Sequence, residues 1–291
     1  MHPFSSDTPW EGVTEVEYVA RMGVALVTGA STGIGKATAI RLAREPGTEL
    51  VLVARREELL RELADSLPCR ATYVAVDLTD DDAPQRVRAH FEAEHDGALQ
   101  LLDNNAGAAW RGSFAEVGYA NVHRHMELNF DAVVRLTEAL LPLLRASAPS
   151  ALVNVASTAG RVARARTGSY SASKFALIGW TDALHAEEAP NGVHVGMVLP
   201  GFIRTEGFPA TELREKALTR WVVSEPEKVA EAIYECGPGG RAERYVPRPY
   251  GVFAALRILS PWLVRRVLGG GAASSLTTST AAEREQTPDQ S

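Results

Sequence analysis

The glycine-rich turn at residues 29–35 constrains the fold of this chain more than any other feature of its sequence. The apolar run Val24–Thr28 precedes it, and a helical pattern through Arg44 follows it. Glycine at positions 29, 33 and 35 lets the backbone turn sharply and leaves no Cβ to obstruct an approaching pyrophosphate. The helix that begins near Gly33 points its unpaired amide groups at the same place. A tight strand–helix turn without a ligand is the alternative, but its position at the start of a strand–helix array favours a phosphate-binding loop.

Predicted strands and helices alternate after this turn. Further strands are expected at Leu50–Ala54, Ala71–Val76, Leu99–Leu102, Ala151–Val155, Val193–Leu199 and around Arg244–Val246. Helices are expected at Glu57–Leu67, in a polar segment that ends near Glu94, and at Val117–Ala146, Gly168–Glu188, Glu212–Thr219 and Glu227–Glu235. The strands are continuous runs of Val, Leu and Ala without polar alternation, which is typical of strands buried on both faces. The order therefore predicts an α/β fold in which helices cover both faces of a parallel sheet.

A tyrosine and a lysine in the second long helix form a candidate proton-transfer pair. Tyr170 and Lys174 are four positions apart, so their side chains share one face of the helix. A phenol with a pKa near 10 is a poor acid–base catalyst at neutral pH, and we expect a close ammonium group to lower that pKa. Ser157 lies just past the fifth strand, at the edge where such sheets bind ligands, and is placed to hydrogen-bond a substrate oxygen. Taken singly, these residues also fit a packed ring beside a lysine and a strand-end cap.

Five motifs in this order resemble the short-chain dehydrogenase/reductase family: Thr28–Gly35, Asn104–Gly107, Ser157, Tyr170–Lys174 and Pro200–Gly201. The resemblance covers about residues 22–250, and Ser157 precedes Tyr170 by the thirteen positions usual in that family. It implies a single doubly wound Rossmann domain around a seven-stranded parallel sheet. It also implies assembly into a homodimer or a homotetramer.

The resemblance also implies a catalytic set, which consists of Asn129, Ser157, Tyr170 and Lys174. Within this set Asn129, in the helix after the fourth strand, would order a water that contacts Lys174. Lys174 would in addition hold the nicotinamide ribose. The function expected from these roles is an oxidoreductase that transfers a hydride between NADP(H) and a carbonyl or secondary alcohol, with Tyr170 as general acid and base. Two alternatives are a non-catalytic NADP(H)-binding Rossmann module, which usually lacks the Tyr or Lys, and an epimerase or lyase on the same fold.

The end of the second strand favours NADP(H) over NAD(H). NAD-specific folds carry an acidic residue about 20 positions past the glycines, where it binds the adenosine 2′-hydroxyl. Here the strand ends in Val53-Ala54-Arg55-Arg56, and guanidinium groups suit a 2′-phosphate. A solvated helix start is the alternative explanation of the two arginines. Asp77 resembles the family residue that contacts the adenine amine, and Leu78 would pack on the adenine ring. We expect the cofactor to contact Gly29, Ser31, Thr32, Gly33, Ile34, Gly35, Arg55, Arg56, Asp77, Leu78, Asn105, Ala106, Gly107, Tyr170, Lys174, Pro200, Gly201, Ile203 and Thr205.

One residue departs from the family pattern. The residue before Asn104 is usually apolar in that family, and here it is Asp103. A carboxylate at the end of an interior strand needs partners, or its pKa rises. The alternative is that this strand end is locally exposed.

The substrate side is less defined. Arg161, Arg164 and Arg166 lie between Ser157 and Tyr170, in a loop expected to border the substrate. They favour an anionic substrate, such as a carboxylate or a phosphopantetheine conjugate, or else are surface charges that flank the site. The segment after Pro200–Gly201 contains Phe202, Ile203, Phe208 and Trp221. Its apolar content indicates a lipophilic ketone or alcohol, or simply core packing.

Charge and cysteine content exclude several other classes. A formal net charge of −6 argues against a nucleic-acid partner, because no broad basic surface can neutralise phosphates. Cys69 and Cys236 are the only cysteines and lie far apart without metal-ligand spacing, so no disulfide framework and no metal site is expected. This pattern fits a cytoplasmic protein. We expect residues 1–21 to be a poorly ordered extension, 22–249 the catalytic domain and 270–291 a disordered tail.

The segment 250–269 has a composition of its own. Residues 250–268 are apolar with three arginines, and Pro261 should divide them into two short helices. An apolar face with Arg and Trp is typical of a helix that lies at a membrane surface. A flap over the substrate pocket and a part of the subunit interface are the alternatives.

Overall fold

A seven-stranded parallel sheet forms the centre of the computed structural model, which describes residues 23–204, 223–262, 264 and 266. The strands are β1 (Val24–Thr28), β2 (Glu49–Ala54), β3 (Ala71–Ala75), β4 (Leu101–Asn104), β5 (Ser150–Val155), β6 (Val193–Pro200) and β9 (Glu243–Val246). They lie in the order β3-β2-β1-β4-β5-β6-β9, and every pair is parallel. The predicted doubly wound, seven-stranded fold is confirmed.

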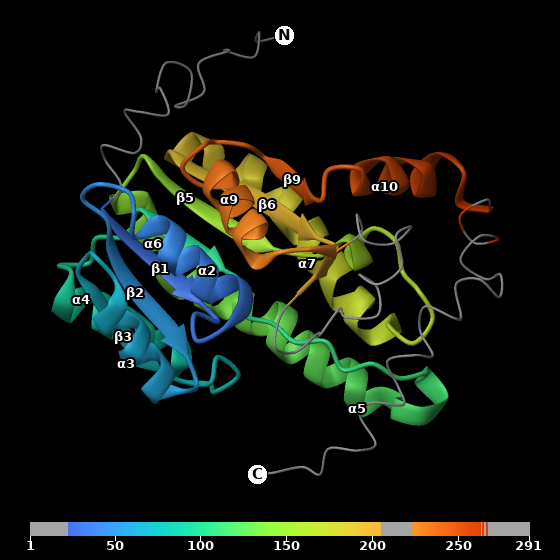
Figure 1. The fold of residues 1–291 in the computed structure, drawn as a ribbon, viewed down its shortest axis with the longest axis horizontal. Coiled ribbons are helices and arrows are strands. Elements are labelled where there is room, and N and C mark those ends of the chain that lie inside the picture. Colours follow the sequence, from blue (N-terminus) through green and yellow to red (C-terminus); the bar gives the residue numbers. More distant parts are fainter. Residues whose placement is uncertain (1–22, 205–222, 263, 265, 267–291) are drawn as a thin grey trace, which may run out of the picture.

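Helices cover both faces of this sheet (Figure 1). The helices are α2 (Gly33–Leu42), α3 (Glu57–Ser66), α4 (Ala83–Glu94), α6 (Ala132–Ala146), α7 (Gly168–Glu188) and α9 (Pro226–Cys236). Leu42, Leu60 and Ile233 place α2, α3 and α9 in the apolar core on one face. Phe91 and Leu140 place α4 and α6 in the core on the other. Because apolar residues on both faces of the strands are buried, the strand sequences lack polar alternation.

The chain reverses its direction of travel across the sheet between β1 and β4. After β3 it returns past β2 and β1, and β4 pairs with the free side of β1. Parallel sheets bind ligands in the crevice outside the carboxyl ends of the strands at such a switch point. The glycine turn after β1 and the Asn104–Gly107 segment after β4 therefore lie at the same crevice.

The predicted helix Val117–Ala146 is not continuous. It consists of α5 (Phe114–Met126), a π-helical turn η1 (Glu127–Asp131) and α6. Ser113 and Glu116 form a capping box that starts α5 three residues earlier than expected. The wider turn at η1 rotates the residues it contains relative to the helix on either side, and such turns occur often at functional sites. Asn129 lies within it.

The fourth strand also differs from its prediction. It runs over Leu101–Asn104 rather than Leu99–Leu102, because pairing with β5 begins at Leu101 and continues to Asn104. The amide of Leu99 instead donates to the Ser147 hydroxyl at 3.0 Å. Two polar residues, Asp103 and Asn104, thus lie inside the sheet.

Short helical turns, a two-stranded sheet and a C-terminal helix complete the described structure. They are η2 (Thr158–Gly160), η3 (Ala189–Asn191), β7 (Phe202–Ile203), β8 (Val223–Ser224) and α10 (Tyr250–Leu259). β7 and β8 pair in a small sheet of their own. Helix α10 ends at Leu259 and helical residues resume at Pro261, as expected from that proline. No described helix is long and apolar enough to span a bilayer. The expected helix Glu212–Thr219, the residues Thr205, Phe208 and Trp221, and the segments 1–21 and 270–291 lie outside the described residues.

Candidate active site

The glycine turn has the geometry of a phosphate cradle. Gly29 and Gly33 have φ values of +66° and +56°, a region that favours glycine. A Cβ at Gly35 would overlap the carbonyl oxygen of Gly29, so the start of α2 lies directly against the loop. The side chain of Thr32, the N-cap residue of α2, does not cap the helix. The first-turn amides of α2 therefore point out of the loop without a side-chain cap, which suits an anion.

Thr28 joins the ends of β1 and β4. Its hydroxyl donates to the Asp103 carbonyl at 3.0 Å and accepts from the amides of Asn105 at 2.9 Å and Ala106 at 3.0 Å. The Asn105 side chain returns a hydrogen bond to the Thr28 carbonyl at 2.8 Å. These bonds hold Asn105 and Ala106 against the glycine loop. A Cβ at Gly29 would lie 2.9 Å from the side-chain amide nitrogen of Asn105. The sequence places Thr28 in the glycine motif but did not predict this role, although a polar residue at the end of an apolar strand is a signal for it.

The two arginines after β2 have different partners. The Arg56 guanidinium donates to the hydroxyls of Ser31 at 3.3 Å and Thr32 at 3.1 Å, so it lies over the glycine loop. Arg55 instead forms an ion pair with Asp77 at 3.6 Å. The hydroxyl and amide of Thr79 bond the other Asp77 oxygen and, with Arg55, hold the pKa of this carboxyl below its usual value, although burial opposes them. Arg56 is thus the guanidinium that faces the expected phosphate position.

Ser157, Tyr170 and Lys174 meet at the carboxyl ends of β5 and β6. The Ser157 hydroxyl hydrogen-bonds the Tyr170 side chain, and it also donates to the Pro200 carbonyl at 3.3 Å. Lys174 is 4% exposed, and its ammonium group donates to the Val155 carbonyl at 2.8 Å. Burial lowers the pKa of Lys174 to about 8. Tyr170 and Lys174 occupy adjacent turns of α7, as their spacing predicts.

Asn129 reaches the same place from the π-helical turn. It is fully buried, and its side chain bonds the Ala108 backbone and the Ser173 hydroxyl. A Cβ at Gly107 would lie 2.9 Å from the Asn129 oxygen and 3.5 Å from the Lys174 nitrogen. The structure therefore brings together all four predicted catalytic residues. The water-ordering role of Asn129 stays a prediction.

The pKa of Tyr170 differs from the expectation. Burial raises the pKa of the phenol above its ordinary value, because desolvation disfavours the phenolate. The hydrogen bond from Ser157 and the charges of Arg164 and Arg111 act in the opposite direction but do not overcome burial. Two arginines thus oppose the rise in the pKa of Tyr170. Arg164 was expected to border the substrate, whereas the sequence did not point to Arg111.

Comparison with known proteins identifies the family. A family model described as short chain dehydrogenase matches residues 23–216. This chain belongs to the short chain dehydrogenase family. A ketoacyl reductase of Nostoc, HetN, is 32% identical over 210 residues, which cover 72% of each chain. A cis-4-hydroxycyclohexanecarboxylate dehydrogenase of Sinomonas cyclohexanicum is 36% identical over 220 residues, 72% of this chain and 87% of the other. The L-sorbose reductase of Gluconobacter frateurii, solved with NADPH and L-sorbose, has a TM-score of 0.67 at 27% identity and covers 77% of this chain and 94% of its own.

As a short chain dehydrogenase, the protein is a hydride-transferring oxidoreductase with a nicotinamide cofactor. The residues present fit that cofactor, since the glycine loop forms a cradle that a Cβ at Gly35 would fill. The other expected contacts lie around the same crevice. Leu78 is 9% exposed and packs in the apolar core, and Ile203 is buried in β7, so both present little surface to a ligand.

Asp103 lies beneath this crevice in an unusual environment. It is fully buried, and neither of its carboxylate oxygens has a hydrogen-bond partner among the described residues. Burial raises its pKa well above the ordinary value. The alternative of a locally exposed strand end is therefore wrong, because β5 and β1 flank β4 on both sides.

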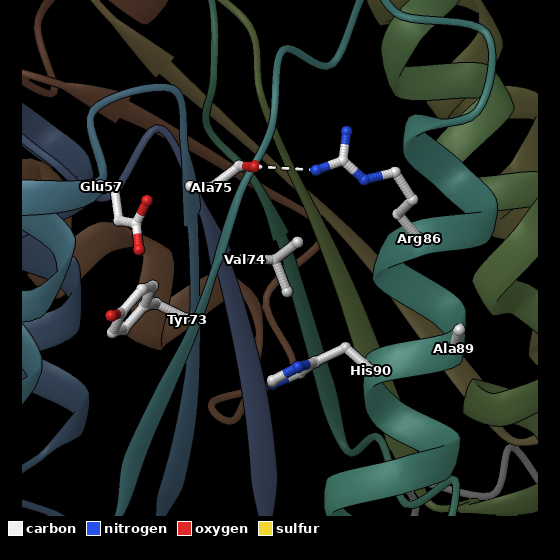
Figure 2. A pocket seen from close by; sticks show the side chains of 7 residues that line it. All are labelled: Glu57, Tyr73, Val74, Ala75, Arg86, Ala89 and His90. Carbon is white, nitrogen blue, oxygen red and sulfur yellow. Dashed lines mark hydrogen bonds between the residues drawn. The ribbon is translucent and has the colours of Figure 1, made fainter.

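One cavity in the described residues lies away from this crevice. Figure 2 shows it beside the edge strand β3, where Arg86 donates to the Ala75 carbonyl at 3.2 Å. Its volume is about 620 Å³, and it is lined by Glu57, Tyr73, Val74, Ala75, Arg86, Ala89 and His90. Three strands separate β3 from β5, where Ser157 follows. None of the four catalytic candidates lines this cavity.

Proposed function

We propose that this short chain dehydrogenase is an NADP(H)-dependent enzyme that interconverts a carbonyl and a secondary alcohol, with Tyr170 as proton donor and acceptor. The observation that carries the proposal is the hydrogen bond between Ser157 and Tyr170 beside the buried Lys174. Three groups of suitable chemistry thus meet at the carboxyl edge of the sheet, next to the phosphate cradle.

The residues of the chain divide the work at a substrate oxygen. Ser157 is placed to orient that oxygen by a hydrogen bond, and Tyr170 gives it a proton in reduction or takes one in oxidation. The resulting phenolate is stabilised by the positive charges of Arg164 and Arg111. When bound, the cofactor supplies or accepts the hydride. Asn129 holds the Ala108 backbone beside Lys174 and thereby fixes the position of the Asn104–Gly107 segment.

The preference for NADP(H) rests on Arg56. Its guanidinium already lies over the hydroxyls of the glycine loop, and no acid takes the 2′-hydroxyl position at the end of β2. Arg56 would bind the 2′-phosphate with charge-assisted hydrogen bonds. The presence of NADPH in the similar L-sorbose reductase structure supports this choice.

For the substrate we propose a broad class, namely carbonyl compounds with an apolar portion. Phe202, which follows Pro200–Gly201 at the site, is partly exposed. Similar proteins are named for ketoacyl, cyclohexanecarboxylate and sugar substrates. A screen of NADPH oxidation over steroid, acyl, aromatic and sugar ketones, with NADH in parallel, would define it. Assembly into homodimers or homotetramers, a cytoplasmic location and the absence of a nucleic-acid partner remain predictions.

Replacement of Tyr170 by Phe tests the proposed mechanism. We expect Tyr170→Phe to reduce turnover by about 100-fold or more, because general acid–base catalysis contributes that much, while NADPH binding measured by fluorescence persists. Tyr119→Phe is the matched control, since Tyr119 is 74% exposed on α5. Unchanged turnover in Tyr170→Phe would refute the role. Binding of NADPH without turnover of any carbonyl by the unaltered protein would favour a non-catalytic module.

A further inference from the structure

The three arginines between Ser157 and Tyr170 do not have equivalent surroundings. Arg161 pairs with Glu243 at 2.8 Å and lies 3.8 Å from Asp182. Arg166 pairs with Glu116 at 3.0 Å. Arg164 has no acidic partner within ion-pair distance in the part of the chain that the structure describes. Arg161 and Arg166 are thus held in ion pairs with other parts of the chain, whereas Arg164 is not.

The Arg164 side chain lies against Phe202, just after Pro200–Gly201. Its guanidinium carbon lies 4.5 Å from the centre of the Phe202 ring, a cation–π contact. Its backbone carbonyl accepts from the Thr167 hydroxyl at 2.9 Å, in the turn that leads into α7. The side chain is only partly exposed, so the guanidinium has lost some of its hydration. The contact with Phe202 at the guanidinium and the hydrogen bond at the backbone together fix the direction of the Arg164 side chain.

A second donor without a partner lies beside it. The Tyr250 hydroxyl is buried and has no hydrogen-bond partner among the described residues. The Tyr250 ring covers Gly201 so closely that a Cβ there would overlap it. The Arg164 guanidinium lies on the ring of the next residue, Phe202, and its charge lowers the pKa of both the Tyr250 and Tyr170 phenols, although burial raises both. Arg164 and Tyr250 therefore border the site of the proposed proton transfer.

A partly desolvated cation and an unpaired hydroxyl are costly unless something binds them. A neutral, purely apolar substrate would satisfy neither group. An oxyanion would satisfy both, because a guanidinium offers two parallel donors and the phenol offers a third. The same groups would then discriminate strongly against a substrate that lacks the anion.

We propose that Arg164 and the Tyr250 hydroxyl bind an oxyanion, a carboxylate or a phosphate, carried by the carbonyl substrate. The inference rests on the proposed function and narrows its substrate class. It makes Arg164 a specificity-determining residue and leaves proton transfer to Tyr170.

The test compares each anionic ketone with its neutral counterpart. The probes are 4-oxopentanoate and 6-oxoheptanoate against their methyl esters, and dihydroxyacetone phosphate against dihydroxyacetone. The two keto acids differ in the distance from carbonyl to carboxylate, and the phosphate pair distinguishes the two anions. We expect at least one anionic probe to have a kcat/KM about 10-fold or more above that of its partner, as expected for a hydrogen-bonded charge.

Arg164→Gln should reduce that ratio to near one, and Tyr250→Phe, which keeps the ring over Gly201, should reduce it in part. The ratio is the readout, because loss of the Arg164 charge also affects Tyr170 and lowers both rates. Arg166→Gln is the matched control and should leave the ratio unchanged. An equal fall for the anionic and neutral members, or no anionic preference in the unaltered protein, would overturn the inference.

A binding measurement separates this inference from the proposed function. Isothermal titration with the same keto acids requires no turnover. If the acids bind in an Arg164-dependent manner but nothing is reduced, the recognition site stands and the proposed reaction fails. If esters are reduced in a Tyr170-dependent manner and the acids show no advantage in rate or binding, the reaction stands and the recognition site fails.

Helix α10 carries an independent observation. This helix and the residue Trp262 beyond its end expose large apolar side chains, from 38% for Leu256 to 79% for Leu259. The set, called the apolar face below, is Val252, Phe253, Leu256, Ile258, Leu259 and Trp262. Only Ala254 of this helix is fully buried. The helix extends to one side of the molecule, away from the layers that cover the sheet (Figure 1).

The sequence on either side of this helix carries charges of a single sign, although the first of them, Arg244, pairs with Glu235 on α9. Between Glu243 and Glu283 the sequence contains five arginines and no acidic residue, although the whole chain has a net charge of −6. An apolar face with arginines and a terminal tryptophan complements an anionic lipid surface. We infer that α10 docks the protein on an anionic bilayer surface, with this apolar face in the interfacial region.

Vesicle co-sedimentation of the full chain tests this docking. We expect binding to phosphatidylcholine vesicles that contain phosphatidylglycerol, weaker binding to pure phosphatidylcholine, and a decrease with salt. The triple variant Ile258→Gln, Leu259→Gln, Trp262→Gln should lose most of it, about 10-fold or more from the removal of apolar burial. Phe114→Gln, at a residue 71% exposed on α5, is the control. Equal vesicle binding by the triple variant and the unaltered protein would overturn the inference. A variant that binds vesicles equally but has a different oligomer mass by light scattering would overturn it too, and would assign the face to contact with a second copy of the chain.

Discussion

The side-chain amide of Asn129 exchanges two hydrogen bonds with the backbone of Ala108. Its oxygen accepts from the Ala108 amide at 2.9 Å, and its nitrogen donates to the Ala108 carbonyl at 3.0 Å. The π-helical turn thus fixes the loop that follows β4, beside Lys174. We expect Asn129→Ala to reduce kcat by about 10-fold or more and to lower the free energy of unfolding by about 1–3 kcal/mol, the cost of unsatisfied buried groups. Steady-state kinetics and urea unfolding would measure the two effects.

Asn121→Ala is the matched control for that variant. Asn121 is also buried, and it bonds the Trp110 carbonyl of the same loop at 3.2 Å. We expect a comparable loss of stability with a smaller loss of kcat. Equal losses of kcat in the two variants would mean that Asn129 acts only as a structural residue.

Arg56 and Arg55 should differ in their effect on cofactor choice. Arg56 lies over the glycine loop, whereas Arg55 is paired with Asp77. Arg56→Gln should therefore raise the KM for NADPH by about 10- to 100-fold, which corresponds to a charge-assisted hydrogen bond, and change the KM for NADH little. Arg55→Gln should have a smaller effect on the same ratio. A larger effect at Arg55 would reverse this assignment.

Much of the fold could be predicted because the signals are local. The largely apolar runs of β1, β5 and β6 and the glycine spacing after Thr28 require only neighbouring residues to interpret. Ser157 could be placed at the carboxyl edge because it directly follows such a run. The π-helical turn at Glu127–Asp131 could not be predicted from the sequence. The apolar periodicity of Val117–Ala146 does not reveal a change from i→i+4 to i→i+5 hydrogen bonds.

The surroundings of the site depended on contacts from distant parts of the chain. The sequence does not distinguish Arg164 from Arg161 and Arg166, because the acids that pair with the latter two lie on β9 and α5. The predicted fall in the pKa of Tyr170 is wrong, because the spacing from Lys174 does not show the burial of the phenol, which raises that pKa. Burial and long-range charge pairing are properties of the folded chain, so local pattern cannot supply them.

Asp103 should make the stability of the protein depend on pH. In the unfolded chain this carboxyl titrates near its ordinary pKa, about 3.9, and in the folded protein burial raises the pKa well above that value. The folded state is therefore favoured below the unfolded pKa and loses stability as pH rises through the folded pKa, by about 1.4 kcal/mol for each unit between the two. We expect Asp103→Asn to be more stabilising at pH 8 than at pH 5, as measured by urea unfolding. Asp65→Asn, at an exposed position of α3, should show no such difference, and an identical change at both pH values for Asp103→Asn would contradict the burial of a charge.

Gly35 and Gly179 should respond in opposite ways to the same substitution. A Cβ at Gly35 would overlap the Gly29 carbonyl and lie 2.7 Å from the Asn105 amide nitrogen, whereas a Cβ at Gly179 meets nothing within 4 Å. Gly35→Ala must displace either the start of α2 or the glycine loop, so we expect a loss of about 1–3 kcal/mol in the free energy of unfolding together with weaker NADPH binding. Gly179→Ala lies on the exposed side of α7 and should stabilise the protein by about 0.5–1 kcal/mol through reduced unfolded-state entropy. Urea unfolding and fluorescence titration with NADPH measure both effects. Unaltered NADPH affinity in Gly35→Ala would show that the loop after β1 does not hold the cofactor phosphates.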